Sequence, residues 1–121
     1  MENNSLKSLQ IARQFLGKEV EVVFDRPIGT KHPKFGFIYE ANYGYIPNVK
    51  AQDGEDLDAF YLGTDQALEK AKGIAKAIIH RLEDDDDKLV VMPKEMNMTD
   101  KEIEKAVHFQ EKWFKHEILR K

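Results

Sequence analysis

The segment from Asp53 to Asp58 carries four carboxylates within six residues, on Asp53, Glu55, Asp56 and Asp58. In an extended chain, side chains two positions apart point to the same side, so Asp53 and Glu55 would share one face. Asp58 begins the apolar run that follows and can reach the same space if the intervening loop bends. Oxygen ligands of this kind suit a hard cation such as Mg²⁺ or Mn²⁺. Because Asp-Gly is also a favoured turn pair, a solvated acidic turn explains the segment equally well.

A second acidic run, Glu83 to Asp87, places five consecutive carboxylates between two apolar runs and directly before Lys88. A run of like charges is usually a solvated face. Five carboxylates in one tight turn also repel one another unless cations neutralise them. Two such clusters in one short chain therefore favour a metal site, with two surface turns as the alternative.

Cationic and aromatic side chains flank these acidic segments in the sequence. A phosphate group could bridge such a cation and a bound metal, although each cation alone is typical of a protein surface. Tyr43 and Tyr45 are typical of a core, but a phenol can also donate a hydrogen bond to a phosphate oxygen. The sequence contains no glycine-rich phosphate loop. The flanking cations are Arg26, Lys31, Lys34 and Lys88.

The composition is that of a globular chain with little net charge. Of the 121 residues, 41% are hydrophobic and 34% charged, which allows one packed core. A formal net charge of −3 provides no global positive field, so we expect no nucleic-acid partner and no membrane partner. The absence of cysteine excludes thiolate ligands and thiol nucleophiles. We expect one soluble, cytoplasmic domain over residues 1–121. The sequence does not decide whether this domain forms a homo-oligomer.

The elements that must position these residues begin and end with predicted helices. Residues 5–16 place apolar side chains on one face, and Gly17 provides a stop. Thr99 and Glu102 form a capping box, after which an apolar stripe continues to Ile118. Between the helices, apolar runs predict short strands. The segment 66–72 is compatible with either a short helical turn or a loop. This order favours a small barrel or strongly curled sheet with helices outside. The predicted strands are 19–24, 58–62, 74–82 and 89–92, with further short strands within 35–47.

Three blocks of the sequence resemble soluble family I inorganic pyrophosphatases. They are Asn42 to Pro47 (NYGYIP), Asp53 to Asp58 (DGEDLD), and the acidic run that continues through Lys88 to Pro93 (KLVVMP). The blocks occur in the family's order with similar spacing. The resemblance implies an α+β, mainly β fold: an OB-like five-stranded β-barrel with flanking N- and C-terminal helices. It also implies hydrolysis of pyrophosphate to two phosphates by a water activated by Mg²⁺ or Mn²⁺, in a short, loop-trimmed member.

The resemblance also implies roles for individual residues. Glu55 resembles the group that receives the proton of the attacking water, and Asp53 and Lys88 join it as catalytic residues. The implied metal ligands are Asp53, Asp58, Glu83, Asp86 and Asp25. The implied substrate-binding residues are Lys31, Tyr43, Lys88 and Lys115.

Several positions depart from the family pattern. Glu55 replaces an aspartate, and Asp56 replaces a proline. The hairpin between Pro27 and Tyr39 is shortened. A Tyr-Lys pair that the family carries on its C-terminal helix has only Trp113, Phe114 and Lys115 nearby.

Three functions therefore compete at this stage. The first is an active Mg²⁺-dependent inorganic pyrophosphatase. The second keeps the metal site but takes another phosphoanhydride such as a nucleotide, because trimmed loops would open the site. The third is a non-catalytic metal- or phosphate-binding module, because the altered segment around Glu55 is the one expected to carry catalysis.

Overall fold

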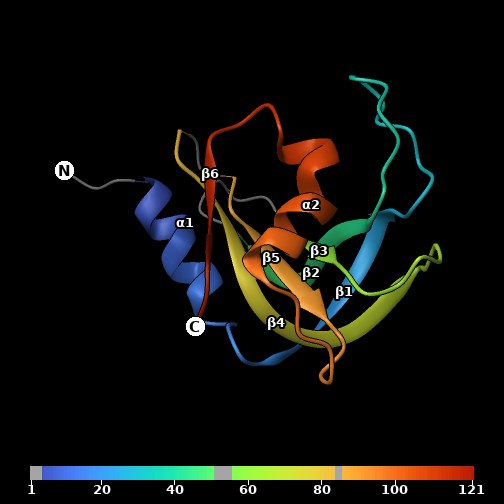
Figure 1. Cartoon of the computed structure of the whole chain (residues 1–121). Helices are drawn as coiled ribbons and strands as arrows, with labels where there is room; N and C mark the ends of the chain where they lie inside the picture. Colours follow the sequence, from blue (N-terminus) through green and yellow to red (C-terminus); the bar gives the residue numbers. More distant parts are fainter. Residues whose placement is uncertain (1–3, 51–55, 84–85) are drawn as a thin grey trace.

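The computed structural model describes residues 4–50, 56–83 and 86–121. Within these residues the chain forms six strands, with one helix before the first strand and one before the last (Figure 1). The elements are α1 (Asn4–Arg13), β1 (Glu19–Arg26), β2 (Asn42–Lys50), β3 (Asp56–Tyr61), β4 (Lys70–Arg81), β5 (Lys88–Met92), α2 (Asp100–Glu111) and β6 (His116–Leu119).

Five of the strands close into a barrel in the order β1-β2-β3-β5-β4, with β4 pairing back to β1. The β3–β5 pair is parallel, and the other pairs are antiparallel. The sixth strand, β6, adds to β4 outside the ring. The predicted OB-like five-stranded barrel with flanking helices is thus confirmed. Closure leaves the barrel strands without the long open edges that invite aggregation.

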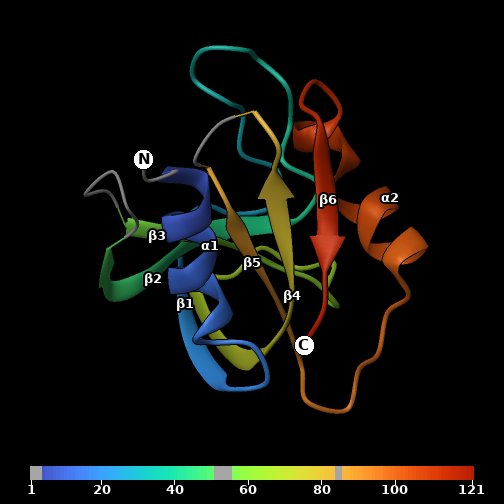
Figure 2. The same ribbon diagram turned by 90° about the vertical axis from the view of Figure 1, so that its left-hand side faces the viewer.

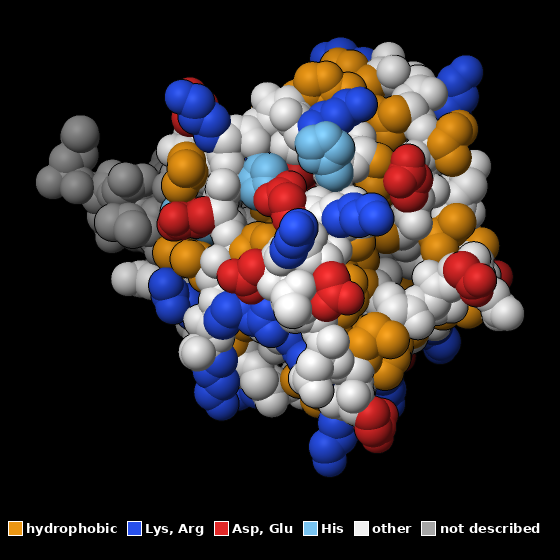
Figure 3. All heavy atoms as spheres, in the orientation of Figure 1, with side chains coloured by type: hydrophobic (Ala, Val, Ile, Leu, Met, Phe, Trp, Pro, Cys, Tyr) orange, Lys and Arg blue, Asp and Glu red, His pale blue; other side chains and the backbone are white. Residues whose placement is uncertain are grey.

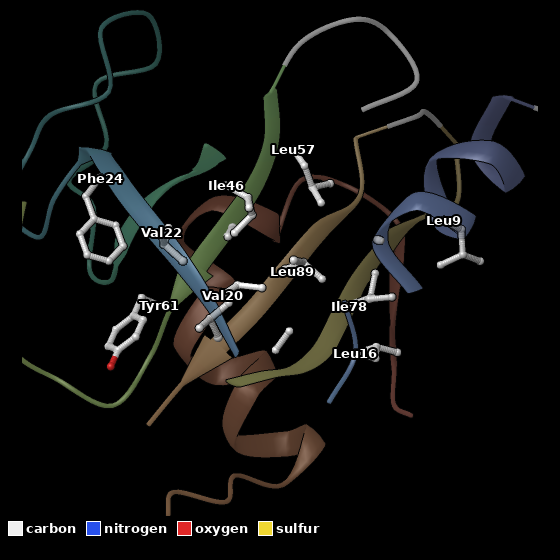
Figure 4. Close-up of a cluster of buried hydrophobic side chains, with 14 residues drawn as sticks. Leu9, Leu16, Val20, Val22, Phe24, Ile46, Leu57, Tyr61, Ile78 and Leu89 are labelled. Carbon is white, nitrogen blue, oxygen red and sulfur yellow. The ribbon is translucent and has the colours of Figure 1, made fainter. Parts of the chain in front are cut away.

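Side chains alternate between two cores along β2, β3, β4 and β5, as the twofold period of a strand predicts. In β3, Leu57 and Ala59 point inward to the barrel interior, while Phe60 belongs to the outer cluster under α2. In β5, Leu89 likewise belongs to the barrel interior and Val90 to the outer cluster. Figure 4 shows the inner cluster, which includes Leu57 of β3 and Leu89 of β5. After Lys88, β5 is apolar on both faces because both faces are covered.

The two helices cover different parts of the barrel (Figure 2). Leu9 and Ala12 of α1 join the barrel interior, so α1 closes one opening of the ring. On the opposite face of the sheet, Ile103 and Val107 of α2 pack on the outer cluster. The predicted capping box is present: Thr99 accepts from the backbone N–H of Glu102, whose carboxylate accepts from the backbone of Thr99.

One predicted element is wrong. The stripe expected to continue as helix to Ile118 ends at Glu111, and residues 116–119 form β6 instead. The cause lies in β4, which is longer than the strand beside it. One edge of β4 pairs with β5. On the other edge β1 pairs only with Lys70 to Ile74, which leaves that edge of Ile78 to Arg81 without a barrel strand beside it. β6 pairs with that second part, which satisfies backbone groups that a longer helix would have left buried and unbonded.

Smaller differences concern the loops. β4 begins at Lys70, four residues before the predicted start, so the segment left open at 66–72 is part loop and part strand. Residues 35–41 contain only an isolated bridge between Lys31 and Ile38.

The surface is mixed in charge on the face seen in Figure 3, where acidic and basic side chains are interspersed with apolar ones. In the described part of the chain, no helix is both long and apolar enough to cross a bilayer.

Candidate active site

A pocket of about 700 Å³ opens on the outer side of the barrel, beside the C-terminal end of α2. Its polar side chains come from β1, β3, β4, β5, the turn before β5 and α2, which are far apart in sequence. On a strand, such a side chain can alternate with inward core residues. Asp58, for example, lies between the buried, inward-pointing Leu57 and Ala59. The charged and amide residues of the lining are Asp25, Arg26, Asp58, Arg81, Asp86, Lys88 and Gln110.

Asp58 is the most perturbed carboxyl group of this pocket. Burial raises its pKa from the ordinary 3.8 to about 6, and the negative charges of Asp86 and Asp25 push in the same direction. A hydrogen bond from the Tyr43 hydroxyl to Oδ2 at 2.6 Å and the charge of Lys88 offset part of this rise. Three carboxylates thus influence one another across a common space. Burial and the repulsion between like charges both disfavour the ionised carboxylate, and a bound cation would offset both.

Lys88 supplies a buried positive charge next to Asp58. The two residues are direct partners across the parallel β3–β5 pair, and Lys88 is 1% exposed. Its Nζ lies 3.0 Å from Oδ2 of Asp86 and 3.4 Å from Oε2 of Glu111. It also donates to the backbone carbonyl of Asp86 at 3.1 Å. These oxygens surround the buried Nζ and fix the Lys88 side chain at the floor of the pocket.

Arg81 and Glu111 belong to this site and were missed by the sequence analysis. Arg81 Nε donates to Glu111 Oε1 at 2.8 Å, and Nη2 lies 3.6 Å from Oδ2 of Asp86. Its guanidinium carbon sits 3.7 Å from the centre of the Phe114 ring, in cation–π contact. Burial alone would raise the pKa of Glu111. The charges of Lys88 and Arg81, with hydrogen bonds from Arg81, outweigh burial, so that its pKa lies below the ordinary 4.5.

The sequence does contain a signal for Glu111. Ile103, Val107 and Glu111 are spaced by four residues on α2, which places all three on one helix face. The first two are apolar core residues, and all three are fully buried. A carboxylate that continues a buried apolar stripe must find a cationic partner, and Arg81 at the end of an apolar strand is such a partner.

The acidic run divides between the pocket and the interior. Asp86 lines the pocket, whereas the next residue, Asp87, is buried against His80. Oδ1 of Asp87 lies 2.8 Å from His80 Nδ1 and accepts from the backbone N–H of Arg81 at 3.0 Å. Asp87 therefore anchors the turn between β4 and β5, while Asp86 faces the site.

The structure brings together half of the residues that the sequence analysis proposed. The ones that line the pocket are Asp25, Tyr43, Asp58, Asp86 and Lys88. Three others are exposed and do not belong to the lining: Lys31, Glu83 and Lys115. Asp53 and Glu55 lie outside the described residues, as do Asp84 and Asp85.

The donor set fits a hard divalent cation. Asp25, Asp58 and Asp86 offer only carboxylate oxygens to the pocket, which matches the preference of Mg²⁺. Across residues 4–50, 56–83 and 86–121, no three His, Asp or Glu side chains converge closely enough to form a ready metal cluster. The mutual repulsion seen at Asp58 is the property that a cation would relieve.

A family model for inorganic pyrophosphatase matches residues 14–118, which includes every element except α1 and the last residues of β6. The chain belongs to the inorganic pyrophosphatase family. This confirms the family that the three sequence blocks resemble.

Solved pyrophosphatase structures share the family fold with this chain. The enzyme from Helicobacter pylori superposes with a TM-score of 0.64 at 20% identity, covering 85% of each chain. The protein from Ehrlichia chaffeensis gives a TM-score of 0.63 at 16% identity, covering 84% of this chain and 85% of its own. The one from Neisseria gonorrhoeae gives 0.59 at 21% identity, with 77% and 72% covered. A comparison of the sequence with curated proteins found no significant match.

Proposed function

We propose that this chain hydrolyses pyrophosphate to two phosphates in the pocket between β3, β5 and the end of α2, with Mg²⁺ as the activating cation. Inorganic diphosphatase activity is the function that membership of the family supports. The observation that carries the assignment to this pocket is the pairing of Asp58 with Lys88. It sets a carboxylate of raised pKa beside a buried ammonium.

The cationic floor would bind the phosphates. Lys88 and Arg81 are both buried, and both are oriented by Glu111. An ammonium and a planar guanidinium held in this way can donate to phosphate oxygens without losing side-chain freedom on binding. The Tyr43 hydroxyl at the same wall donates its one proton to Asp58, so it orients that carboxylate beside the phosphate site. Binding a highly charged anion here costs little reorganisation, because the donors are already in place.

The carboxylates would hold the cation. Asp25, Asp58 and Asp86 line the pocket, and we include Asp53 as a ligand on the basis of the sequence motif alone. When bound, Mg²⁺ or Mn²⁺ neutralises substrate charge and acidifies a water molecule. The residues of the chain then position that water and the phosphates relative to each other, and a carboxylate such as Glu55 accepts the proton.

Three of the roles proposed from sequence are not needed for this site. Lys31, Lys115 and Glu83 would each have to move into the pocket to bind substrate or metal. A cytoplasmic location and a homo-oligomer stay predictions.

The direct test measures phosphate release from pyrophosphate over a range of Mg²⁺ and Mn²⁺ concentrations. We expect turnover with either metal and its loss in Asp58→Asn and Lys88→Met. Lys101→Met is the matched control, since it removes an exposed lysine of α2 from outside the pocket. Metal-dependent binding of pyrophosphate without any turnover would instead identify a non-catalytic module, and recovery of activity in Glu55→Asp would trace that loss to one methylene group.

A further inference from the structure

The pocket has an aromatic half that pyrophosphate does not require. Seven of its fourteen lining residues carry aromatic rings, counting histidine. Every outer atom of pyrophosphate is a charged oxygen, so the ion has no apolar surface to place against a ring. The polar floor around Lys88 already accounts for phosphate binding. Pyrophosphate binding therefore does not explain why half of the pocket lining is aromatic.

Two segments build this half, and they meet at one contact. The loop between β1 and β2 contributes Phe35 and Phe37, and the segment after α2 contributes Trp113. These segments lie beside each other at one end of the molecule (Figure 1). The rings of Phe37 and Trp113 are 5.5 Å apart, and His32 lies 4.8 Å from Phe37 and 5.0 Å from Phe35. The rings form a continuous wall from one segment to the other, which we call the aromatic wall (His32, Phe35, Phe37 and Trp113).

Part of this wall is left open to solvent. Phe35 is 64% exposed and Trp113 is 57% exposed, although both line a pocket. Burying a large aromatic side chain is worth about 1.5–3 kcal/mol, so rings left exposed beside a pocket mark a surface that gains free energy when a ligand covers it.

The loop that carries Phe35 is held in its conformation by hydrogen bonds within the loop. Nδ1 of His32 accepts from the backbone N–H groups of Lys34 at 3.1 Å and Phe35 at 3.0 Å. Gly36 adopts a φ of 79°, which favours glycine, and its N–H donates to the carbonyl of His32 at 3.0 Å. With Nδ1 engaged as an acceptor, a neutral His32 carries its proton on Nε2. The wall is thus largely preformed, which lowers the cost of binding a rigid planar group.

We infer that the aromatic wall binds the base of a nucleoside di- or triphosphate, so that the chain hydrolyses nucleotides as well as pyrophosphate. This inference rests on the proposed function, because it takes the floor around Arg81 and Lys88 as the phosphate site. Both halves belong to one pocket of about 700 Å³, within the usual range of about 300–1,000 Å³ for organic ligands. A ligand that spans them carries phosphates at one end and a flat ring at the other.

The chemistry is the same as for pyrophosphate. Water adds to a phosphorus atom, its oxygen stays on that phosphoryl group, and the bond from phosphorus to the bridging oxygen breaks. The bridging oxygen leaves with the electron pair on the second product, and the proton of the water passes to a carboxylate. Stacking a base on an aromatic side chain contributes about 1–3 kcal/mol, or about 5- to 150-fold in affinity.

The test uses the Mg²⁺-loaded protein and compares ligands that carry a base with ligands that carry none. Trp113 is the single tryptophan of the chain, so its fluorescence reports on the wall directly. We expect a methylene-bridged analogue of a nucleoside triphosphate to quench this emission, and methylene diphosphonate to leave it nearly unchanged. In turnover, a nucleoside triphosphate should have a lower KM than inorganic triphosphate.

A pair of variants in one loop isolates the wall. Phe35→Ala should lower the ratio of kcat/KM for the nucleotide to kcat/KM for pyrophosphate by about 5- to 100-fold, since it removes a stacking ring. Ile38→Ala is the matched control, because Ile38 is 50% exposed on the same loop but does not line the pocket. It should leave the ratio unchanged.

Three outcomes overturn the inference. The first is pyrophosphate turnover with no preference for nucleotide over inorganic triphosphate, which leaves the proposed function standing. The second is a Phe35→Ala variant with the same ratio as the wild type. The third is a change of oligomeric state in that variant without a change in the ratio, which would make the wall an interface between copies. Ring-dependent binding without hydrolysis of any phosphoanhydride would instead retain the wall as a nucleotide site and overturn the proposed function.

Discussion

The hydroxyl of Tyr43 donates a 2.6 Å hydrogen bond to Oδ2 of Asp58 across neighbouring strands. Tyr43 pairs with Phe60 and Asp58 with Tyr45, so the two side chains are diagonal neighbours on one face of the β2–β3 pair. The bond orients one carboxylate oxygen and leaves the other edge of the carboxylate toward the pocket. It also opposes the effect of burial on the pKa of Asp58.

Tyr43→Phe should therefore raise the pKa of Asp58 further above about 6. The hydrogen bond favours the ionised form, and a bond to a charged group is worth about 1.5–3 kcal/mol. At pH 6.5 we expect the variant to bind Mg²⁺ more weakly than the wild type, with the difference shrinking by pH 8.5. Calorimetric titration at both pH values measures it. Equal affinity of the two proteins at pH 6.5 would mean that Asp58 is not a ligand.

Asp58→Asn should stabilise the metal-free fold while abolishing activity. The folded pKa of about 6 lies above the ordinary 3.8, so ionising Asp58 costs the folded state free energy. This cost is absent below pH 3.8, grows as the pH rises, and is complete above about pH 6. We expect a gain of about 1–3 kcal/mol at pH 7.5 and little gain at pH 3.5. Urea unfolding in metal-free buffer at both pH values provides the comparison, and a loss of stability at pH 7.5 would contradict this account.

Glu111→Gln should destabilise the protein and remove part of its acid sensitivity. Since the folded pKa of Glu111 lies below 4.5, its ionised form stabilises the fold above pH 4.5, and this contribution is lost as the pH falls through the folded pKa. Removing one partner of a buried ion-pair network costs about 3–5 kcal/mol. We expect a loss of this order at pH 7 and a smaller one at low pH, measured by urea unfolding. Glu117→Gln, on an exposed position of β6, is the control and should change little.

Arg81→Lys should weaken substrate binding even though it keeps the positive charge. A lysine has no planar fork to pair with Glu111 and stack on Phe114, so its charge would not be held toward the phosphates. We expect KM for pyrophosphate to rise about 10-fold or more, which corresponds to the loss of one charge-assisted hydrogen bond. Arg120→Lys, at an exposed pair with Asp100, serves as the control. An unchanged KM in Arg81→Lys would show that Arg81 is only structural.

Much of the fold could be predicted from the sequence because its signals are local. The capping box at Thr99 is complete within four residues. The alternation of Leu57, Asp58 and Ala59 follows from the geometry of a strand. Tyr43, Asp58 and Lys88, which line the pocket, could be singled out because each lies in a short motif that resembles the family.

Other features of the fold and the site were decided only by the tertiary structure, because they depend on contacts between segments that are distant in the sequence. Whether residues 116–119 form helix or strand depends on the free edge of β4, which begins 46 residues earlier in the chain. Asp86 and Asp87 are chemically alike, and the register of the turn alone sends one to the pocket and the other to His80. Arg81 meets Glu111, 30 positions away in the sequence, because a strand end and a helix end pack together. Such pairs share no local pattern, because burial and charge compensation act between neighbours in space rather than in sequence.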